Sequence, residues 1–337
     1  MKKYIINDFA KCSISKKVKA QKDITTFARQ VGYRPILLPV YPLSHDFNSK
    51  LKKLKYSKIT IPKLLKNAND ADVIVFQYPM YSTFLMNHLI EDIKKYTHAK
   101  LVYVIYDIEG IRMFDDTDNY SDNELLLLKQ ADGIIAHNQP MTDWLKEHGI
   151  TVPIVNLGIF DYQNPQLINQ DMDYNKSVVF AGSLEKSTFL TKLNLKDTKL
   201  TLYGPNPADQ YEGKLSPEEL PKKLTQNFGL VWDGDELDTC SGTYGHYLQF
   251  NAPHKTSLYL SSGIPVIIWK KAAMAKFIEE NHVGLAIDNL NDLDNVLAQI
   301  TDDEYKTIKQ NAINMAMRLR EGHYTKIALD QIVKQVM

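Results

Sequence analysis

The stretch NAPHKTSLYLSSGIPVII, residues 251–268, contains a predicted helix followed directly by a predicted strand. Pro253 suits the first helical turn, where its missing N–H costs nothing. Gly263 and Pro265 are typical of a helix end, and the apolar residues that follow favour a buried strand. A helix that leads straight into an apolar strand is the building unit of an α/β fold with a parallel sheet.

The same alternation of apolar runs and helical patterns continues along most of the chain. We predict strands at 3–7, 34–40, 72–79, 100–108, 133–138 and 153–159, and further on at 177–183, 199–205, 228–234, 264–270 and 283–288. We predict helices at 17–31, 60–69, 83–96, 121–131 and 140–148. Near-continuous apolar strands separated by helices indicate parallel sheets that are covered on both faces.

A polar segment at 160–177 interrupts this alternation, and we interpret it as a linker. A chain of 337 residues is long enough for about two domains. We therefore predict two Rossmann-like α/β domains, at 1–160 and 161–320, that face each other across a cleft, and a closing helix at 321–337. Ligands of such sheets bind beyond the carboxyl ends of the strands.

Composition narrows the class of protein. The chain has 40 basic and 40 acidic residues and a formal net charge of zero, which argues against nucleic-acid binding because such proteins usually carry a basic surface. Cys12 and Cys240 belong to no CxxC pair or histidine cluster, so we expect neither a zinc site nor a disulfide framework. We see no signal peptide and no apolar run of about 18 residues, and expect a cytoplasmic protein without a transmembrane segment.

The start of the helix within 251–268 has an unusual charge pattern. His254 and Lys255 stand at the helix end where the macrodipole already disfavours positive charge. The first N–H groups of the helix, on His254, Lys255 and Thr256, point outward and favour an anion. We therefore predict a phosphate site here. The alternative is an ordinary helix start with an incidental lysine.

Two turns after strands could contribute to the same site. Gly182 and Ser183, in VVFAGSLEKS, would let a ligand approach the backbone closely, and Lys186 adds a positive charge. Tyr203, in LTLYGPNP, could contact a base or a sugar. Ordinary loops explain each turn taken alone, and the absence of GxGxxG gives dinucleotide binding little support.

Candidate general bases follow a strand of the first domain. Asp107 and Glu109, in VIYDIEGIR, could take a proton from an attacking hydroxyl, and Arg112 stands beside them. An aspartate in this place can equally cap a helix. The loop after the first strand also faces the ligand side and carries several lysines, which a solvated basic loop explains equally well.

Two acidic DxD patterns occur. Asp116 with Asp118, and Asp233 with Asp235, could each bind a divalent metal beside a nucleotide. Such short matches are common by chance, and we interpret these residues as solvated loop acids.

Taken together, these segments resemble the glucosyltransferase 3-like group of bacterial glycosyltransferases, which have the GT-B fold. NDFAKCSISKK, VIYDIEGIR, FAGSLEKS, FGLVW and the helix start at His254 and Lys255 occur in the expected order along nearly the whole chain. The group includes enzymes that extend the O-linked sugar of serine-rich-repeat adhesins, and β-1,6-galactofuranosyltransferases of surface-polysaccharide synthesis.

The resemblance implies a UDP-sugar donor held by the second domain, a glycoprotein or glycolipid acceptor held by the first, no metal or other cofactor, and a homo-oligomer, possibly a tetramer. The matching donor-binding positions are Gly182, Ser183, Lys186, Tyr203, His254, Lys255 and Ser257. Ser15, Lys17 and Arg112 would hold the acceptor or the diphosphate. Glucosyltransferases of the family carry arginine where this chain has Lys186, which keeps the charge but loses forked hydrogen bonding.

We expect an inverting transfer of glucose or N-acetylglucosamine from the UDP-sugar to the O-linked N-acetylglucosamine of an adhesin. Asp107 is the expected general base, with Glu109 as its substitute. The alternatives are galactofuranosyl transfer in surface-polysaccharide synthesis, a UDP-sugar epimerase, which needs no acceptor, and a non-catalytic glycan-binding partner subunit.

Overall fold

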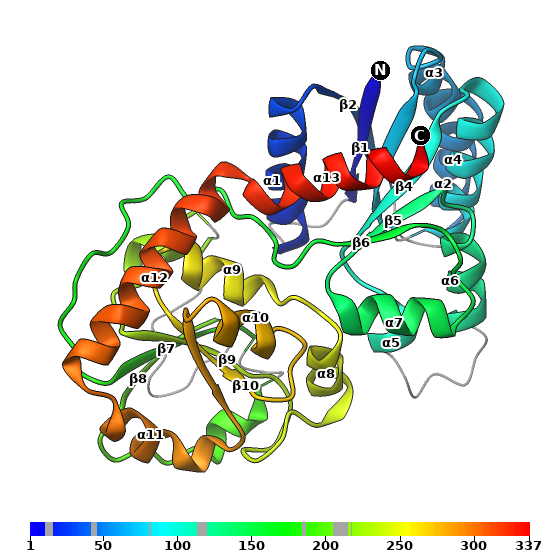
Figure 1. Ribbon diagram of the computed structural model, residues 1–337. Helices are drawn as coiled ribbons and strands as arrows, with labels where there is room; N and C mark the ends of the chain where they lie inside the picture. Colours follow the sequence, from blue (N-terminus) through cyan, green and yellow to red (C-terminus); the bar gives the residue numbers. More distant parts are fainter. Residues whose placement is uncertain are drawn as a thin grey trace. The chain divides into compact units, whose positions relative to one another are not determined.

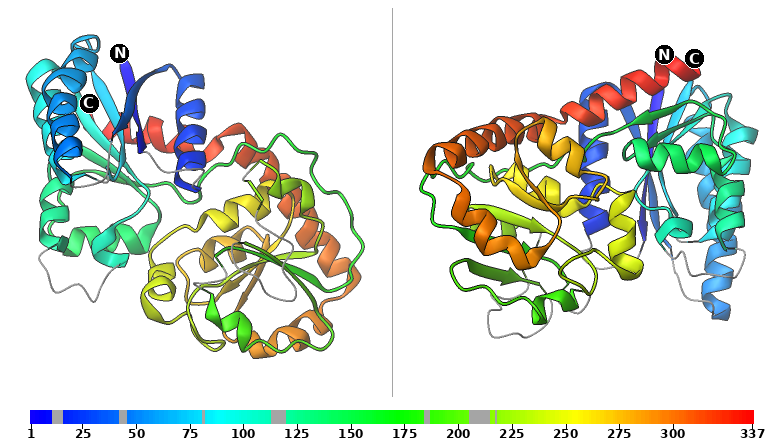
Figure 2. Two further views of the ribbon diagram at one scale, coloured as in Figure 1. Left: turned by 180° about the vertical axis from the view of Figure 1, so that it is seen from behind. Right: turned by 60° about the horizontal axis from the view of Figure 1, so that its bottom comes forward.

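The structure is a computed structural model, in which the chain folds into two compact units (Figures 1 and 2). It describes residues 1–10, 16–41, 46–80, 82–112, 120–183, 187–204, 215–216 and 218–337. The N-terminal unit holds most of the chain up to Leu157, together with the last residues, Thr325–Met337. The C-terminal unit holds Gly158–Tyr324. Within the described ranges, no helix is both long and apolar enough to cross a lipid bilayer.

The N-terminal unit is built around a six-stranded parallel sheet with the order β2-β1-β3-β4-β5-β6. Its strands are β1 Lys3–Ala10, β2 Tyr33–Tyr41, β3 Val73–Tyr78, β4 Lys100–Ile105, β5 Gly133–Ala136 and β6 Ile154–Asn156. Its helices are α1 Lys16–Gln30, α2 Phe47–Lys55, the π-helical turn η1 Tyr56–Thr60, α3 Ile61–Lys66, α4 Thr83–Tyr96, α5 Glu109–Arg112, α6 Tyr120–Leu128 and α7 Gln139–Glu147.

The C-terminal unit is built around a five-stranded parallel sheet with the order β11-β10-β9-β7-β8. Its strands are β7 Ser177–Ala181, β8 Lys199–Tyr203, β9 Phe228–Val231, β10 Val266–Trp269 and β11 Gly284–Ile287. Its α-helices are α8 Gly242–His246, α9 His254–Ser261, α10 Ala275–Glu280, α11 Leu293–Gln299 and α12 Asp302–Glu321, and α13 His323–Val336 leads back to the N-terminal unit. Short 3-10 turns lie at Thr188–Thr191, Leu220–Lys223, Tyr247–Gln249 and Leu290–Asp292.

All strands in each sheet are parallel, but the side of the sheet on which successive strands are added changes once in each sheet. This change lies between β1 and β3 in the N-terminal unit and between β7 and β9 in the C-terminal unit. Ligands of open α/β sheets bind at such a switch point, outside the carboxyl ends of the strands. The topology therefore places the candidate ligand site of the C-terminal unit beyond β7 and β9.

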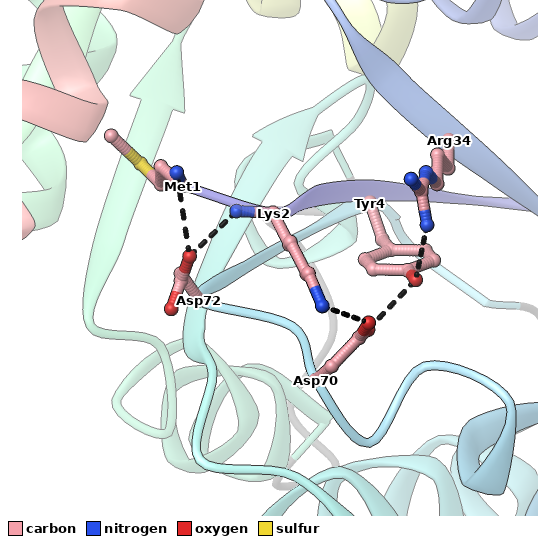
Figure 3. Close-up of polar contacts among 6 residues, drawn as sticks. All are labelled: Met1, Lys2, Tyr4, Arg34, Asp70 and Asp72. Atoms are coloured by element: carbon pink, nitrogen blue, oxygen red, sulfur yellow. Dashed lines mark hydrogen bonds and ion pairs between the residues drawn. The ribbon is translucent and has the colours of Figure 1, made fainter.

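The opposite, amino end of the N-terminal sheet is held together by charged groups that pair with one another (Figure 3). The backbone N–H of Lys2 donates to Asp72 over 2.6 Å, and its Nζ lies 2.6 Å from the Asp70 carboxylate. Asp70 also accepts from the Tyr4 hydroxyl at 2.9 Å, and Arg34 donates to that hydroxyl at 3.4 Å. These contacts join β1 to β2 and to the turn before β3. We therefore interpret this end of the sheet as structural rather than as a ligand site.

The strands lie where the sequence analysis predicts them, apart from their ends. The prediction of helices missed α2, although Phe47, Leu51 and Leu54 recur at helical spacing. In the structure these three residues are exposed and Ser49 and Lys53 are buried, the reverse of the usual pattern.

Gly229 in β9 provides a test of packing beneath the candidate site. A Cβ at this position would lie 2.2 Å from Cγ of Tyr259, whose ring is fully buried and whose hydroxyl accepts a hydrogen bond from the Ala181 N–H at 2.7 Å. Because the ring is fixed at both ends, we expect Gly229→Ala to lower the free energy of unfolding by ~3 kcal/mol or more, measured by urea denaturation.

Gly133→Ala in β5 is the matched control. Its Cβ would meet the Val336 and Ile332 side chains at 2.6 and 2.9 Å, and both are aliphatic groups near the end of the last helix that can shift. A loss of about 1 kcal/mol is expected. Equal losses in the two variants would contradict the role given to Tyr259.

Candidate active site

The turn after β7 lies at the switch point of the C-terminal unit. The Gly182 N–H donates to the Tyr203 carbonyl at 2.9 Å, which joins the ends of β7 and β8. A Cβ on Gly182 would lie 2.9 Å from the Phe180 ring and 3.8 Å from Nζ of Lys255. A larger residue at this position would therefore require the Phe180 ring to shift, and Ser183 follows it half-buried.

Lys255 joins the start of α9 to the end of β9. Its Nζ lies 2.6 Å from Oδ1 of Asp233, donates to the Trp232 carbonyl at 3.1 Å, and lies 4.6 Å from the centre of the Phe180 ring. The Lys255 side chain is only 7% exposed and that of Asp233 27% exposed. A buried ammonium requires such partners because removal from water is costly.

The contact between Asp233 and Lys255 shows that our interpretation of Asp233 was wrong. We took it for a solvated loop acid and left the anion beside Lys255 to be supplied by a ligand, but Asp233 itself supplies an anion. The second residue of that DxD pattern, Asp235, accepts a hydrogen bond from the Thr188 hydroxyl at 2.7 Å. In the described part of the chain, no group of three or more His, Cys, Asp or Glu residues could hold a metal ion.

The first turn of α9 carries the polar groups that a ligand could reach. Pro253 is the N-cap, one place before the position expected, and no side chain caps the helix. His254 stacks on Phe160 with ring centres 4.8 Å apart. Pro253 and His254 are half-buried, whereas the next three residues are buried. A ligand can therefore approach only the very start of this helix.

Three polar atoms around this turn lack a hydrogen-bond partner among the described residues. They are Oδ1 of Asn251, Oγ1 of Thr256 and Oγ of Ser257. Thr256 and Ser257 are fully buried. Leaving a buried polar group unpaired costs about 1–3 kcal/mol, so such a group needs an explanation. The uncapped helix start makes this turn chemically suited to an oxyanion, whereas the hydroxyls of Thr256 and Ser257 are buried out of a ligand's reach.

The remaining donor candidates are less informative. The Tyr203 ring is buried, and its hydroxyl donates to the Lys223 carbonyl at 3.5 Å. Lys186 and Ser15 lie outside the described residues, as do Asp116 and Asp118 of the other DxD pattern, and the side chain of Lys17 in α1 is likewise not described.

In the N-terminal unit, the candidate bases lie at the carboxyl end of β4. Asp107 and Glu109 are half-buried, Glu109 begins the short helix α5, and Arg112 ends it. The preceding backbone is held by His137, whose Nε2 lies 3.0 Å from the Ile105 carbonyl. Burial lowers the pKa of His137 to about 4, so this imidazole is neutral near pH 7 and donates that hydrogen bond.

Glu124 holds the same segment from the other side, and the sequence analysis missed it. Its carboxylate accepts from the N–H of Gly110 at 2.7 Å and from the N–H of Glu109 at 3.2 Å, and from the Tyr78 hydroxyl at 3.1 Å. Burial raises the pKa of Glu124 to about 6, against the lowering effect of these bonds. The only sequence signal was one acid before the apolar run LLLL in α6.

The two α/β units and the helix start at the switch point identify the fold class of the protein. Two parallel α/β units with a helix start at the switch point of the second are the architecture of GT-B glycosyltransferases. A solved structure reported as "Trehalose-6-phosphate from E. coli bound with UDP-2-fluoro glucose" has this architecture: its TM-score to this chain is 0.64, with 9% identity over 98% of this chain and 99% of that one. The chain has the GT-B fold.

The chain belongs to the glucosyltransferase 3-like family. The N-terminal domain of that family matches residues 2–159, and its C-terminal domain matches residues 178–332. The beta-1,6-galactofuranosyltransferase WbbI of Escherichia coli K12 is 30% identical to this chain, and the match covers 98% of both proteins. Glucosyltransferase 3 of Streptococcus gordonii is 25% identical and covers 100% of each chain.

The pH dependence of stability tests the buried carboxyl of Glu124. Burial raises its pKa in the folded protein from 4.5 to about 6, so the folded state binds this proton more tightly than the unfolded chain. The contribution of the Glu124 carboxyl to the stability of the wild type should therefore be complete below pH 4.5 and fall by about 2 kcal/mol as the pH rises through about 6. Glu124→Gln should show no such loss.

The measurement is the free energy of urea unfolding of both proteins between about pH 4.5 and 7. His137 titrates in both proteins and cancels in the difference, and the acceptor lost in the glutamine variant shifts its stability equally at every pH. Glu147→Gln, an exposed change on α7, is the control. Parallel curves for wild type and Glu124→Gln would contradict the assignment.

The Lys255–Asp233 pair is tested by a double-mutant cycle. Asp233→Asn leaves a buried ammonium without its anion and should cost ~3 kcal/mol, part of which Lys255→Met should restore in the double variant. The exposed pair of Lys192 and Glu236, 48% and 49% exposed, should give a coupling energy of ~0.5 kcal/mol in the same thermal-unfolding experiment. A coupling energy as small for Lys255 and Asp233 would mean that their contact is incidental.

Proposed function

We propose that this protein transfers a hexosyl group from a UDP-sugar to a glycan acceptor, with inversion at the anomeric carbon and without a bound metal. The observation that carries the proposal is the uncapped start of α9 at the switch point of the C-terminal unit, in a chain that matches named glycosyltransferases from end to end. The UDP-2-fluoro glucose of the trehalose-6-phosphate structure supports a uridine diphosphate donor.

The diphosphate is assigned to the first turn of α9 and to the turn at Gly182 and Ser183. The N–H groups of a helix start stabilise the negative charge that the UDP leaving group gains as its bond to the sugar breaks. His254 adds a donor and Lys186 a positive charge. Ser257 and Tyr203 are buried, so their proposed role is to support these turns rather than to contact the donor. Lys255, already paired with Asp233, contributes by fixing the start of the helix and by the field of its charge.

The acceptor is assigned to the N-terminal unit. Asp107 takes the proton of the acceptor hydroxyl, the oxygen forms the new bond to the anomeric carbon, and the electron pair of the broken bond leaves with UDP. Glu109 is the substitute base. Arg112, with Ser15 and Lys17, is assigned to the acceptor or the diphosphate. The backbone of this segment is already held by His137 and Glu124, as a positioned base requires.

Two kinds of transfer are candidates. Glucose or N-acetylglucosamine, transferred to the O-linked N-acetylglucosamine of an adhesin, is the first, supported by the relatives named glucosyltransferase 3. Galactofuranose for a surface polysaccharide is the second, supported by the higher identity, 30%, of the galactofuranosyltransferase relative. A homo-oligomer in the cytoplasm, with the tetramer as the candidate size, completes the proposal. Light scattering after size-exclusion chromatography tests the assembly.

Transfer is tested with UDP-glucose, UDP-N-acetylglucosamine and UDP-galactofuranose, each with an N-acetylglucosaminyl peptide and with a glycolipid, and with products identified by mass spectrometry. Asp107→Asn should lower kcat by ~10²-fold or more with little change in donor KM, because it removes a general base and no donor contact. Glu109→Gln should cost less, and Asp143→Asn, exposed on α7, should cost nothing.

Each alternative has its own result in this experiment. An isomerised donor formed without any acceptor would indicate an epimerase. Glycan binding without UDP binding or turnover would indicate a non-catalytic partner subunit. Unchanged kcat in Asp107→Asn, with Glu109→Gln inactive, would move the general base to Glu109.

A further inference from the structure

Helix α2 presents three apolar side chains to the solvent beside its exposed lysines, and its buried side chains are polar. Phe47, Leu51 and Leu54 are 74%, 50% and 47% exposed. On the same helix, the side chains of Ser49 and Lys53 are buried. This inversion of the usual amphipathic pattern means that the exposed face of α2 is not explained by folding of the N-terminal unit.

The helix itself is well anchored. Asp46 caps its start by accepting from the Ser49 N–H at 2.9 Å. Just beyond its end, the Tyr56 hydroxyl donates to the Pro39 carbonyl at 2.7 Å, and the Tyr56 ring packs edge-on against Tyr41. The apolar side chains therefore project from a fixed helix rather than from a loose segment.

The exposed apolar residues form one continuous stripe. At about 100° of rotation per residue, Phe47, Leu51 and Leu54 fall within about 60° of each other around the helix axis. Lys50 and Lys55 lie about 40° beyond the two edges of this α2 stripe. An apolar stripe bordered by lysines on both sides is typical of helices that lie in a membrane interface.

The surrounding sequence has a strong local positive charge. Residues 47–66 contain seven lysines and no aspartate or glutamate, although the whole chain has a formal net charge of zero. Lys50, Lys52, Lys55 and Lys58 of this segment are exposed, as is Ile59 at 56%. The charge complements an anionic surface, because anionic lipids attract clustered lysines close to the bilayer.

We propose that α2 docks the N-terminal unit on an anionic membrane surface, with the α2 stripe among the upper acyl chains and the lysines at the lipid phosphates. A second copy of this chain is a poorer occupant of the stripe. In a two-fold pair of α2 helices the same lysines would face each other, and like charges at close range are repulsive.

The position of α2 relates this surface to the proposed function. α2 begins six residues after β2 ends at Tyr41, so Phe47 stands toward the carboxyl edge of the parallel sheet. Asp107 and Glu109 follow β4 at that same edge. If the proposed transfer is correct, docking through α2 brings this edge toward a lipid-borne acceptor.

The test is sedimentation with vesicles of phosphatidylcholine alone or with about a third of phosphatidylglycerol. The wild type should bind the anionic vesicles and be released by salt, because the attraction is screened. Each lysine near such a surface raises the partition coefficient roughly fivefold, so Lys50→Glu with Lys55→Glu should lower it at least tenfold. Phe47→Ser, Leu51→Ser and Leu54→Ser together should also lower it at least tenfold.

A matched triple variant separates the α2 stripe from general surface hydrophobicity. Leu167→Ser, Met317→Ser and Ile327→Ser change residues that are 96%, 51% and 42% exposed elsewhere and should leave vesicle binding unchanged. Circular dichroism checks folding of every variant. Turnover of a water-soluble acceptor should not change in the α2 variants, so loss of docking and failure of the transferase proposal give different results.

Two results would overturn the proposal. One is the absence of binding to anionic vesicles at low salt, or binding that the α2 variants leave intact. The other is a lower oligomer mass for the α2 stripe variant in light scattering, which would assign the stripe to a contact between copies of the chain.

Discussion

The buried ammonium of Lys255 is the interaction on which the candidate site of the C-terminal unit depends. It joins the start of α9 to the end of β9 through Asp233 and the Trp232 carbonyl, and it lies over the Phe180 ring of β7. The two strands that flank the switch point and the helix start beside them are thereby connected through one side chain. A side chain on Gly182 would lie 2.9 Å from the same Phe180 ring, which would have to shift to make room for it.

The N-terminal unit reaches a similar rigidity by different means. A neutral histidine donates to the backbone just before Asp107, and a buried carboxyl accepts from the backbone just after it. The two groups respond to pH in opposite directions. His137 favours the folded state above its ordinary pKa of 6.5 and stops doing so as pH falls through about 4, whereas Glu124 favours it below 4.5. Between these limits the segment is held with little net dependence on pH.

The sequence was sufficient for the strands and insufficient for several individual side chains. Strands buried on both faces appear as uninterrupted apolar runs, which is why their positions were predictable. α2 was missed although Phe47, Leu51 and Leu54 recur at helical spacing, and the outward direction of these side chains is not visible in the sequence. Glu124 was missed because it acts on backbone N–H groups of another helix, and no spacing in the sequence marks such a contact. Asp233 was misread because Lys255, its partner, is 22 residues away in sequence.

The last helix has a consequence for how the protein is made. α13 packs its side chains of Ile332 and Val336 where a side chain on Gly133 would otherwise stand, and Thr325–Met337 belong to the N-terminal unit. The C-terminal unit is therefore synthesised before α13, the helix that completes the N-terminal unit. Until α13 has been synthesised, the surface of β5 that this helix covers stays exposed, and a nascent chain that stalls before α13 would carry that defect in the unit that was synthesised first.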